Sequence, residues 1–323
     1  MNNSLINKLR FLKRRYQAFS FFKSDFAQIS EAEINKSRNK RIFDIINDYH
    51  VIEKGMTMPE RRLGFGRDAM MRLIGHLNEY YALYGMDDEQ VRVAFGVVKE
   101  YDDLHRKVHA ALSEDLQTAI NDLLSVCPEL VYDAQKEMTK TRFFKDNTMP
   151  FPQFAASRHS VRNFMGGGIL SVDNLKLALR LAQTAPSACN RQSVRVKLIN
   201  NKELITRLFE VQKGNRGFGH LADRLIIITS DMNAWDIRTS KGGYVDGGIY
   251  AMNLLYALHY YKIAACPLNS YFTPEQDKRI REIINIPKSE SIVLFIAVGE
   301  AKEEFRLANS YRNKLDYVLT EYD

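Results

Sequence analysis

The sequence has few cysteines, no long apolar run and no repeat or low-complexity segment. Its three cysteines lie far apart and show no metal-ligand spacing, so we expect neither a disulfide framework nor a metal site. No run of about eighteen apolar residues occurs, which excludes a membrane-spanning helix. The N-terminus lacks the apolar core and cleavage site of a signal peptide, and we therefore expect a cytoplasmic protein.

Charge is unevenly distributed along the chain. The formal net charge is +7, yet residues 1–24 carry six lysines and arginines and no acid, which leaves the remainder near neutral. A neutral body with one basic arm is not typical of a nucleic-acid-binding domain. The arm could make a weak contact with an acidic membrane surface or a partner. Alternatively it is a solvated helix that packs on the body through Leu5, Leu9, Leu12, Tyr16 and Phe19.

The first half of the chain has the periodicity of helices. Apolar residues recur at helical spacing over 33–55, and further helical patterns cover 67–84, 88–112, 114–124 and 129–140. Two prolines in the segment DNTMPFPQF then break the pattern. We therefore predict a helical N-terminal domain over residues 1–149 and a second domain over 150–323.

Strands and helices alternate in the second half. Ser171 is a predicted N-cap of an amphipathic helix, and the segment 247–263 is apolar almost all round, as expected of a central buried helix. Short alternating or apolar runs predict strands over 193–200, 224–231 and 291–300. This alternation predicts a layered α/β or α+β domain.

Four segments of the second half could contribute to a ligand site, and the first of them suits an anion. In SRHSVRNF, Arg158, Ser160 and Arg162 alternate, and two guanidinium groups with a hydroxyl suit a phosphate. The other segments are APSACNRQ (185–192), AACPLNSYF (264–272) and SYRNKL (310–315). Taken singly, each has a plainer interpretation: a surface ion-pair cluster, a Pro-Ser turn with an Asn cap, a loop, or a solvated charged end.

Together, in order and approximate spacing, the four segments resemble the flavin-dependent nitroreductase family. The resemblance covers residues from about 150 to 323. It implies an α+β fold with a central mixed β-sheet flanked by helices, here preceded by an all-helical N-terminal domain. It also implies a homodimer that binds FMN at the subunit interface and takes electrons from NAD(P)H.

The resemblance implies a role for each matching residue. Arg158, Ser160 and Arg312 would bind the FMN phosphate, with His159 beside it and Lys314 adding charge. Arg162, near N1 and O2 of the flavin ring, would stabilise the negative charge of the reduced flavin. Asn215 would contact the pyrimidine edge. The remaining expected contacts are Pro186, Ser187, Ala188 and Asn190 from the partner subunit, and Pro267, Leu268, Asn269 and Ser270 in the loop over N5.

Arg162, Asn269 and Ser270 are the expected catalytic residues. The sequence departs from the family pattern in several places, and Asn269 and Ser270 stand where an acidic residue and a glycine are common. Ser193 and Val194 replace a Pro-Trp pair, and Ser310 replaces a basic residue. These changes bear mainly on which substrate is reduced.

The function implied is ping-pong hydride transfer from NAD(P)H through flavin N5 to a small acceptor. That acceptor could be a nitroaromatic, a quinone or a specialised metabolite. The sequence shows neither a catalytic triad nor a metal motif, as expected where a flavin carries the chemistry. The alternative is a catalytically weakened flavin-fold protein that acts as a binding or regulatory module at a partner or membrane surface.

Four further polar residues have plain interpretations. His50 and Glu53 share one helix face, and a local ion pair is favoured over an acid–base pair. Asp246 is interpreted as a charge near a helix N-terminus, and His259 as a structural histidine.

Overall fold

The computed structural model describes residues 3–126, 132–168, 170–237 and 239–322. Residue contacts divide the chain into two compact units. The family-like unit comprises Met1–Phe26 and Met138–Phe305, and the helical unit comprises Ala27–Glu137 and Arg306–Asp323. The domain boundary predicted between residues 149 and 150 stays a prediction.

The two units carry opposite net charges. The family-like unit has 29 lysines and arginines against 16 aspartates and glutamates, a net charge of +13. The helical unit has 17 against 23, a net charge of −6. The near-neutral remainder seen in the sequence is therefore an average over two regions of opposite sign.

The helical unit contains four helices of 12 to 19 residues, which follow the predicted periodicity closely. Ser37 and Asp88 cap two of them by accepting hydrogen bonds from the Lys40 and Gln90 amides. The helices are α2 (Arg38–Met56), α3 (Arg67–Tyr84), α4 (Glu89–Lys107) and α5 (Glu114–Ser125).

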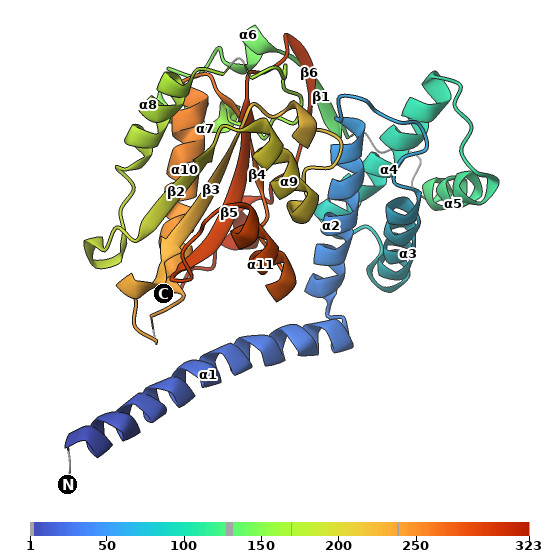
Figure 1. Ribbon diagram of the computed structural model, residues 1–323. Helices are drawn as coiled ribbons and strands as arrows, with labels where there is room; N and C mark the ends of the chain where they lie inside the picture. The colour runs from blue at the N-terminus through green and yellow to red at the C-terminus, as the bar shows by residue number, and fades with distance from the viewer. Residues whose placement is uncertain (1–2, 127–131, 169, 238, 323) are drawn as a thin grey trace. The chain divides into compact units, whose positions relative to one another are not determined.

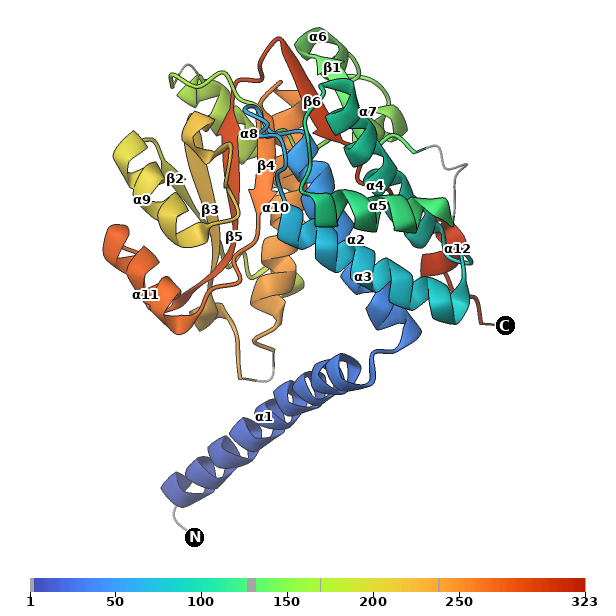
Figure 2. The ribbon, with the colours of Figure 1, turned by 90° about the vertical axis from the view of Figure 1, so that its right-hand side faces the viewer.

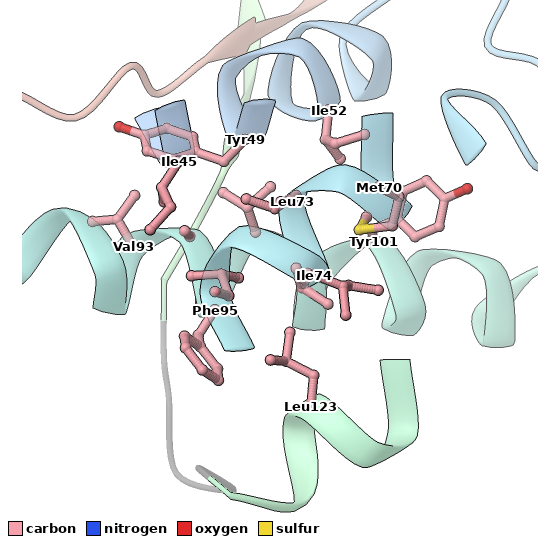
Figure 3. Close-up of a cluster of buried hydrophobic side chains, with 14 of the residues drawn as sticks. Ile45, Tyr49, Ile52, Met70, Leu73, Ile74, Val93, Phe95, Tyr101 and Leu123 are labelled. Carbon is pink, nitrogen blue, oxygen red and sulfur yellow. The ribbon is translucent and has the colours of Figure 1, made fainter. Parts of the chain in front are cut away.

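One hydrophobic cluster joins these helices. Figure 3 shows Leu73 of α3 between Ile52 of α2, Phe95 of α4 and the side of α5 that carries Leu123. All four side chains are almost fully buried. Tertiary burial of these apolar faces, rather than helix propensity alone, stabilises helices of this length.

We predict that Leu73→Ala lowers the free energy of unfolding of the protein by about 3 kcal/mol, because it leaves a cavity in a close-packed core. Leu83→Ala, on the same helix but 56% exposed, should change it by less than about 0.5 kcal/mol. Urea unfolding followed by circular dichroism measures both. Equal losses in the two variants would contradict this account of the core.

The family-like unit is built on a four-stranded sheet in the order β2-β3-β5-β4. All three strand pairs are antiparallel, with Val196 opposite Ile228, Ile228 opposite Leu294 and Pro267 opposite Ile296. The α+β fold with a helical region before the sheet is confirmed, and β3 matches its predicted range. The strands are β2 (Val194–Ile199), β3 (Arg224–Asp231), β4 (Ala264–Leu268) and β5 (Glu290–Gly299).

Helices cover both faces of the sheet, as Figures 1 and 2 show. Helix α10 packs on the strands together with α8, and their apolar residues form one core with Ile226 and Ile296. Helices α9 and α11 pack together on the opposite face (Figure 1). Their bounds are α8 (Val172–Ala182), α9 (Lys202–Gln212), α10 (Gly242–Tyr260) and α11 (Pro274–Ile283).

A second sheet pairs β1 (Gln135–Thr139) with β6 (Glu304–Ala308). The helix predicted over 129–140 is therefore wrong over 135–139, where pairing with a remote strand overrides the local pattern; 129–131 lie outside the described residues. The remaining helices are α1 (Asn3–Asn35), α6 (Lys140–Phe143), α7 (Phe151–Ser157) and α12 (Leu315–Val318), with 3₁₀ turns at Ala188–Asn190, Gly219–Leu221 and Met232–Ala234.

The basic arm forms most of α1. One interpretation of the sequence was that the apolar residues of this helix pack on the body of the protein. The structure does not support it, because more than half of each side chain is exposed at Leu9, Leu12, Tyr16 and Phe19. The side chain of Leu5 lies outside the described residues. Within the ranges that the structure describes, no helix is both long and apolar enough to cross a membrane.

Candidate functional site

The segment SRHSVRNF lies beside strands β4 and β5. Its Val161 amide donates to the Ala265 carbonyl at 3.0 Å, and Phe164 forms an antiparallel bridge with Ala301. Just beyond the segment, the Met165 amide donates to the Glu300 carbonyl at 2.8 Å. These bonds fix the backbone that carries the predicted phosphate ligands.

Three polar side chains of this segment make no hydrogen bond or ion pair in the described parts of the chain. Asn163 is almost fully buried, and its Oδ1 has no hydrogen-bond partner. Ser160 and Arg162 are half-buried, and in the described parts of the chain neither makes a hydrogen bond or an ion pair. Arg158 and His159, also half-buried, do have interactions. A half-buried guanidinium beside a hydroxyl, both without an acceptor, is a donor set that fits an anionic group such as a flavin phosphate or ring oxygen. The residues present therefore fit FMN.

His259 lies buried behind this segment at the end of α10. Its Nε2 is 2.7 Å from the Ser157 hydroxyl oxygen, and the rings of Phe143, Phe144 and Phe154 surround it at 5.1 to 5.6 Å. Burial, with smaller contributions from the neighbouring Arg158 and His159, lowers the pKa of His259 to about 4. The imidazole is therefore neutral at pH 7, which agrees with its interpretation as a structural histidine.

The turn that carries Asn215 and the segment after β4 are joined to SRHSVRNF. The Phe164 and Phe218 rings lie 6.3 Å apart, and Gln212 donates to the Asn269 carbonyl at 2.9 Å. Ser270 donates through its hydroxyl to the Val293 carbonyl. These links bring three of the predicted segments together.

Two residues expected in the loop over N5 lie in a strand instead. Pro267 and Leu268 are the last residues of β4, where Pro267 is opposite Ile296. A proline fits there because β4 is an edge strand of the sheet, and an edge position does not require its missing amide proton. Only Asn269 and Ser270 belong to the loop.

The segment APSACNRQ is held by α10. Asp246 is almost fully buried, and both its carboxylate oxygens lie 3.2 Å from the Ala188 amide, so it is a loop anchor rather than a charge at the helix end. Cys189, Asn190 and Gln192 have φ of 50° to 54°, a left-handed conformation that is uncommon without glycine. Pro186 and Ser187 line a groove of about 830 Å³ together with Arg180 and Arg195.

Arg312 and Lys314 lie on the C-terminal tail of the helical unit and are exposed. Arg312 donates to the Ser310 carbonyl at 2.8 Å, and Lys314 pairs with Glu89 at 3.1 Å. Their assignment to the flavin phosphate stays a prediction, as do the roles of the other predicted site residues.

The His50–Glu53 pair also belongs to the helical unit. His50 Nδ1 is 2.9 Å from a Glu53 carboxylate oxygen, as expected of a local ion pair. Glu53 is fully buried and also accepts hydrogen bonds from the Tyr132 hydroxyl at 3.1 Å and the Ser310 amide at 3.2 Å. Its carboxylate thus holds the tail on the helices, which sequence spacing alone did not indicate.

Residues 155–216 and 214–300 match the model of the nitroreductase family. The matched part of the chain, a little under half of its length, is similar to that family. The match confirms the resemblance and supports an oxidoreductase in general. No curated protein sequence matches the chain.

Solved structures with similar folds cover about half of this chain. An FMN-dependent nitroreductase from Clostridium difficile is 24% identical, and the match covers 53% of this chain and 97% of that one with a TM-score of 0.44. A nitroreductase-like protein from Streptococcus mutans is 21% identical, over 54% and 98%, with a TM-score of 0.47. A protein from Exiguobacterium sibiricum solved in complex with FMN is 18% identical, over 54% and 98%, with a TM-score of 0.48.

Sequence reasoning missed Gln212, which lies next to the predicted Asn215. Its hydrogen-bond partner Asn269 is 57 residues away along the chain, so no local pattern reveals the pair. The available signal was the three glycines in KGNRGFG, since glycines can mark places of close approach.

We predict that the stability of the protein falls as the pH drops from about 6.5 to about 4, in part because of His259. Its pKa is lowered on folding, so over this range the unfolded chain takes up a proton that the folded protein resists. The loss attributable to His259 is about 3 kcal/mol. His259→Phe, which suits the aromatic surroundings, should remove that share of the pH dependence in urea unfolding at pH 7 and pH 4. Parallel losses in both proteins would refute the assignment.

Proposed function

We propose that this protein is an FMN-dependent NAD(P)H oxidoreductase that reduces a small acceptor, such as a nitroaromatic, a quinone or a specialised metabolite, by a ping-pong scheme. FMN, when bound, supplies the hydride chemistry. The observation that carries the proposal is the half-buried and unpartnered pair of Ser160 and Arg162 in the family-like unit. Such donors favour an anionic ligand over solvent.

Each residue would contribute by binding or orientation. Arg158 and Ser160, with His159, would hold the phosphate, and the resemblance adds Arg312 and Lys314 to this task. Arg162 would place its positive charge at N1 and O2, where negative charge develops on reduction.

The pyrimidine edge and N5 would be met by amide groups. Asn215 already donates its amide protons to the Phe209 carbonyl and to Gln212 Oε1, so its Oδ1 is left to accept from the ring N3 proton. Asn269 and Ser270 would present a backbone amide towards N5.

We further propose a homodimer. One side of α10 exposes the large apolar residues Tyr244, Val245 and Ile249, at 52%, 59% and 42%. A contiguous apolar face on the central helix supports burial against a second copy of the chain. Pro186, Ser187, Ala188 and Asn190 would then reach the flavin of the partner subunit.

The test is the absorbance spectrum of the purified protein after incubation with FMN, before and after anaerobic addition of NADH or NADPH. We expect bound flavin bands that bleach on addition. Bands that persist would leave a flavoprotein with another electron donor, and absence of flavin after incubation would contradict the proposal.

In the same experiment Arg158→Ala with Arg312→Ala should weaken FMN binding by about a hundredfold, because two charge-assisted bonds are lost. The matched control is Lys278→Ala with Arg279→Ala, two exposed cations of α11. Full flavin retention by the first double variant would show that the phosphate assignment is wrong.

A second candidate function, docking at a membrane surface, is favoured by α1. Its exposed apolar residues Leu9, Leu12, Tyr16, Phe19 and Phe22 recur every three or four positions. With about 3.6 residues per turn, Arg10 and Arg14 fall on the opposite side of the helix and Lys13 at its border, whereas Lys8, Arg15 and Lys23 fall among the apolar residues. Pairing of two arms would bring like charges together, since residues 1–24 contain no acid. We therefore propose an anionic lipid surface as the occupant.

We expect the full-length protein to co-sediment with vesicles of phosphatidylglycerol and phosphatidylcholine, but not with phosphatidylcholine alone. Lys13→Glu with Arg14→Glu should reduce binding at least tenfold, because each charge near an anionic surface contributes about 1 kcal/mol. Lys278→Glu with Arg279→Glu is the matched control. Equal loss in both variants, or no binding by the wild type, would refute the lipid proposal.

A further inference from the structure

Gln212, the last residue of α9, lies between the two amide-bearing segments of the candidate site. It is 95% buried, and α9 ends directly after it because Lys213 adopts a left-handed φ of 60°. Its side chain therefore leaves the helix end and points among loops rather than into the helix–sheet core.

Each hydrogen bond that the structure describes for the Gln212 side-chain amide joins it to the turn of Asn215 or to the loop of Asn269. Its Nε2 donates to the Asn269 carbonyl at 2.9 Å. Its Oε1 accepts from the Gly214 amide at 2.8 Å and from Asn215 Nδ2 at 3.2 Å. Only one orientation of the side-chain amide satisfies these three partners, so the group is fixed on both sides.

Two glycines make room for this arrangement. A Cβ at Gly214 would lie 2.7 Å from Gln212 Nε2, and a Cβ at Gly219 would overlap the Asn215 side chain. Gly214 and Gly219, two of the three glycines of KGNRGFG, are thus explained by the approach of two amide side chains.

We propose that Gln212 is a positioning residue for the flavin ring, holding Asn215 and Asn269 at the spacing that the ring requires. This inference rests on the proposed FMN binding. Gln212 touches no expected ligand position itself and acts through its two neighbours. Its effect should therefore fall on the ring system and not on the phosphate.

The experiment compares FMN and riboflavin, which share the ring and differ in the phosphate. Dissociation constants of both are measured by fluorescence titration of the apoprotein, and thermal unfolding of the apoprotein reports its folding. Gln212→Met should weaken both ligands by the same factor, about tenfold, since a buried hydrogen-bond network is lost. The double variant Gln212→Met with Asn215→Ala should have dissociation constants no higher than those of whichever single variant binds less tightly. This is expected because the two residues act as one unit.

The matched control is Gln276→Met, which removes another glutamine whose Nε2 donates to a carbonyl near the end of α9, that of Val211 at 3.3 Å. It should leave both affinities within about twofold. If Gln212→Met does not fold, Gln212→Glu keeps the two accepted bonds and loses only the bond to Asn269; a smaller but equal loss for both ligands is then expected.

Three results would overturn the inference. The Gln212 variants could bind both ligands with wild-type affinity, the losses of affinity of the two single variants could multiply in the double variant, or the loss of affinity could be confined to FMN. These results leave the proposed function standing, since the wild type still binds FMN. A wild type that binds neither ligand would refute both the function and the inference.

Discussion

Helix α10 can lie against the sheet only because residue 247 has no side chain: a Cβ there would sit 2.7 Å from Val293 Cγ2. This close approach sets the distance between the central helix and β5. Near one end of the helix Asp246 accepts a hydrogen bond from the Ala188 amide. Near the other end His259 is hydrogen-bonded to Ser157, the first residue of SRHSVRNF. Two segments that we propose to bind the cofactor thus depend on the position of one helix, and a shift of α10 would displace both.

Patterns of local origin could be predicted from the sequence, while features set by remote partners could not. Helix α3 and strand β3 match their predicted ranges because each has one dominant periodicity and clear ends. Strand β4 was read as a loop because it is short and contains Pro267, which only an edge position tolerates. Strand β1 was read as helix because its partner β6 lies far along the chain.

The same division holds at the candidate site. The segments SRHSVRNF, APSACNRQ and KGNRGFG could be picked out from the sequence, because the family resemblance rests on contiguous motifs. Asp246 and Gln212 could not be assigned, because what each does is decided by an amide or carbonyl 57 or 58 residues away. Their residue types are common on helices, and only the folded arrangement shows that they are buried and shared between loops.

The segregation of charge also affects how fast ligands arrive. A unit with a net charge of +13 raises the local concentration of small anions around it, and nucleotides are such anions. Encounter rates with this unit should therefore decrease steeply as the ionic strength rises towards the physiological range, where the Debye length is about 8 Å. The acidic helical unit, at −6, has the opposite effect and lowers the local concentration of the same anions around itself.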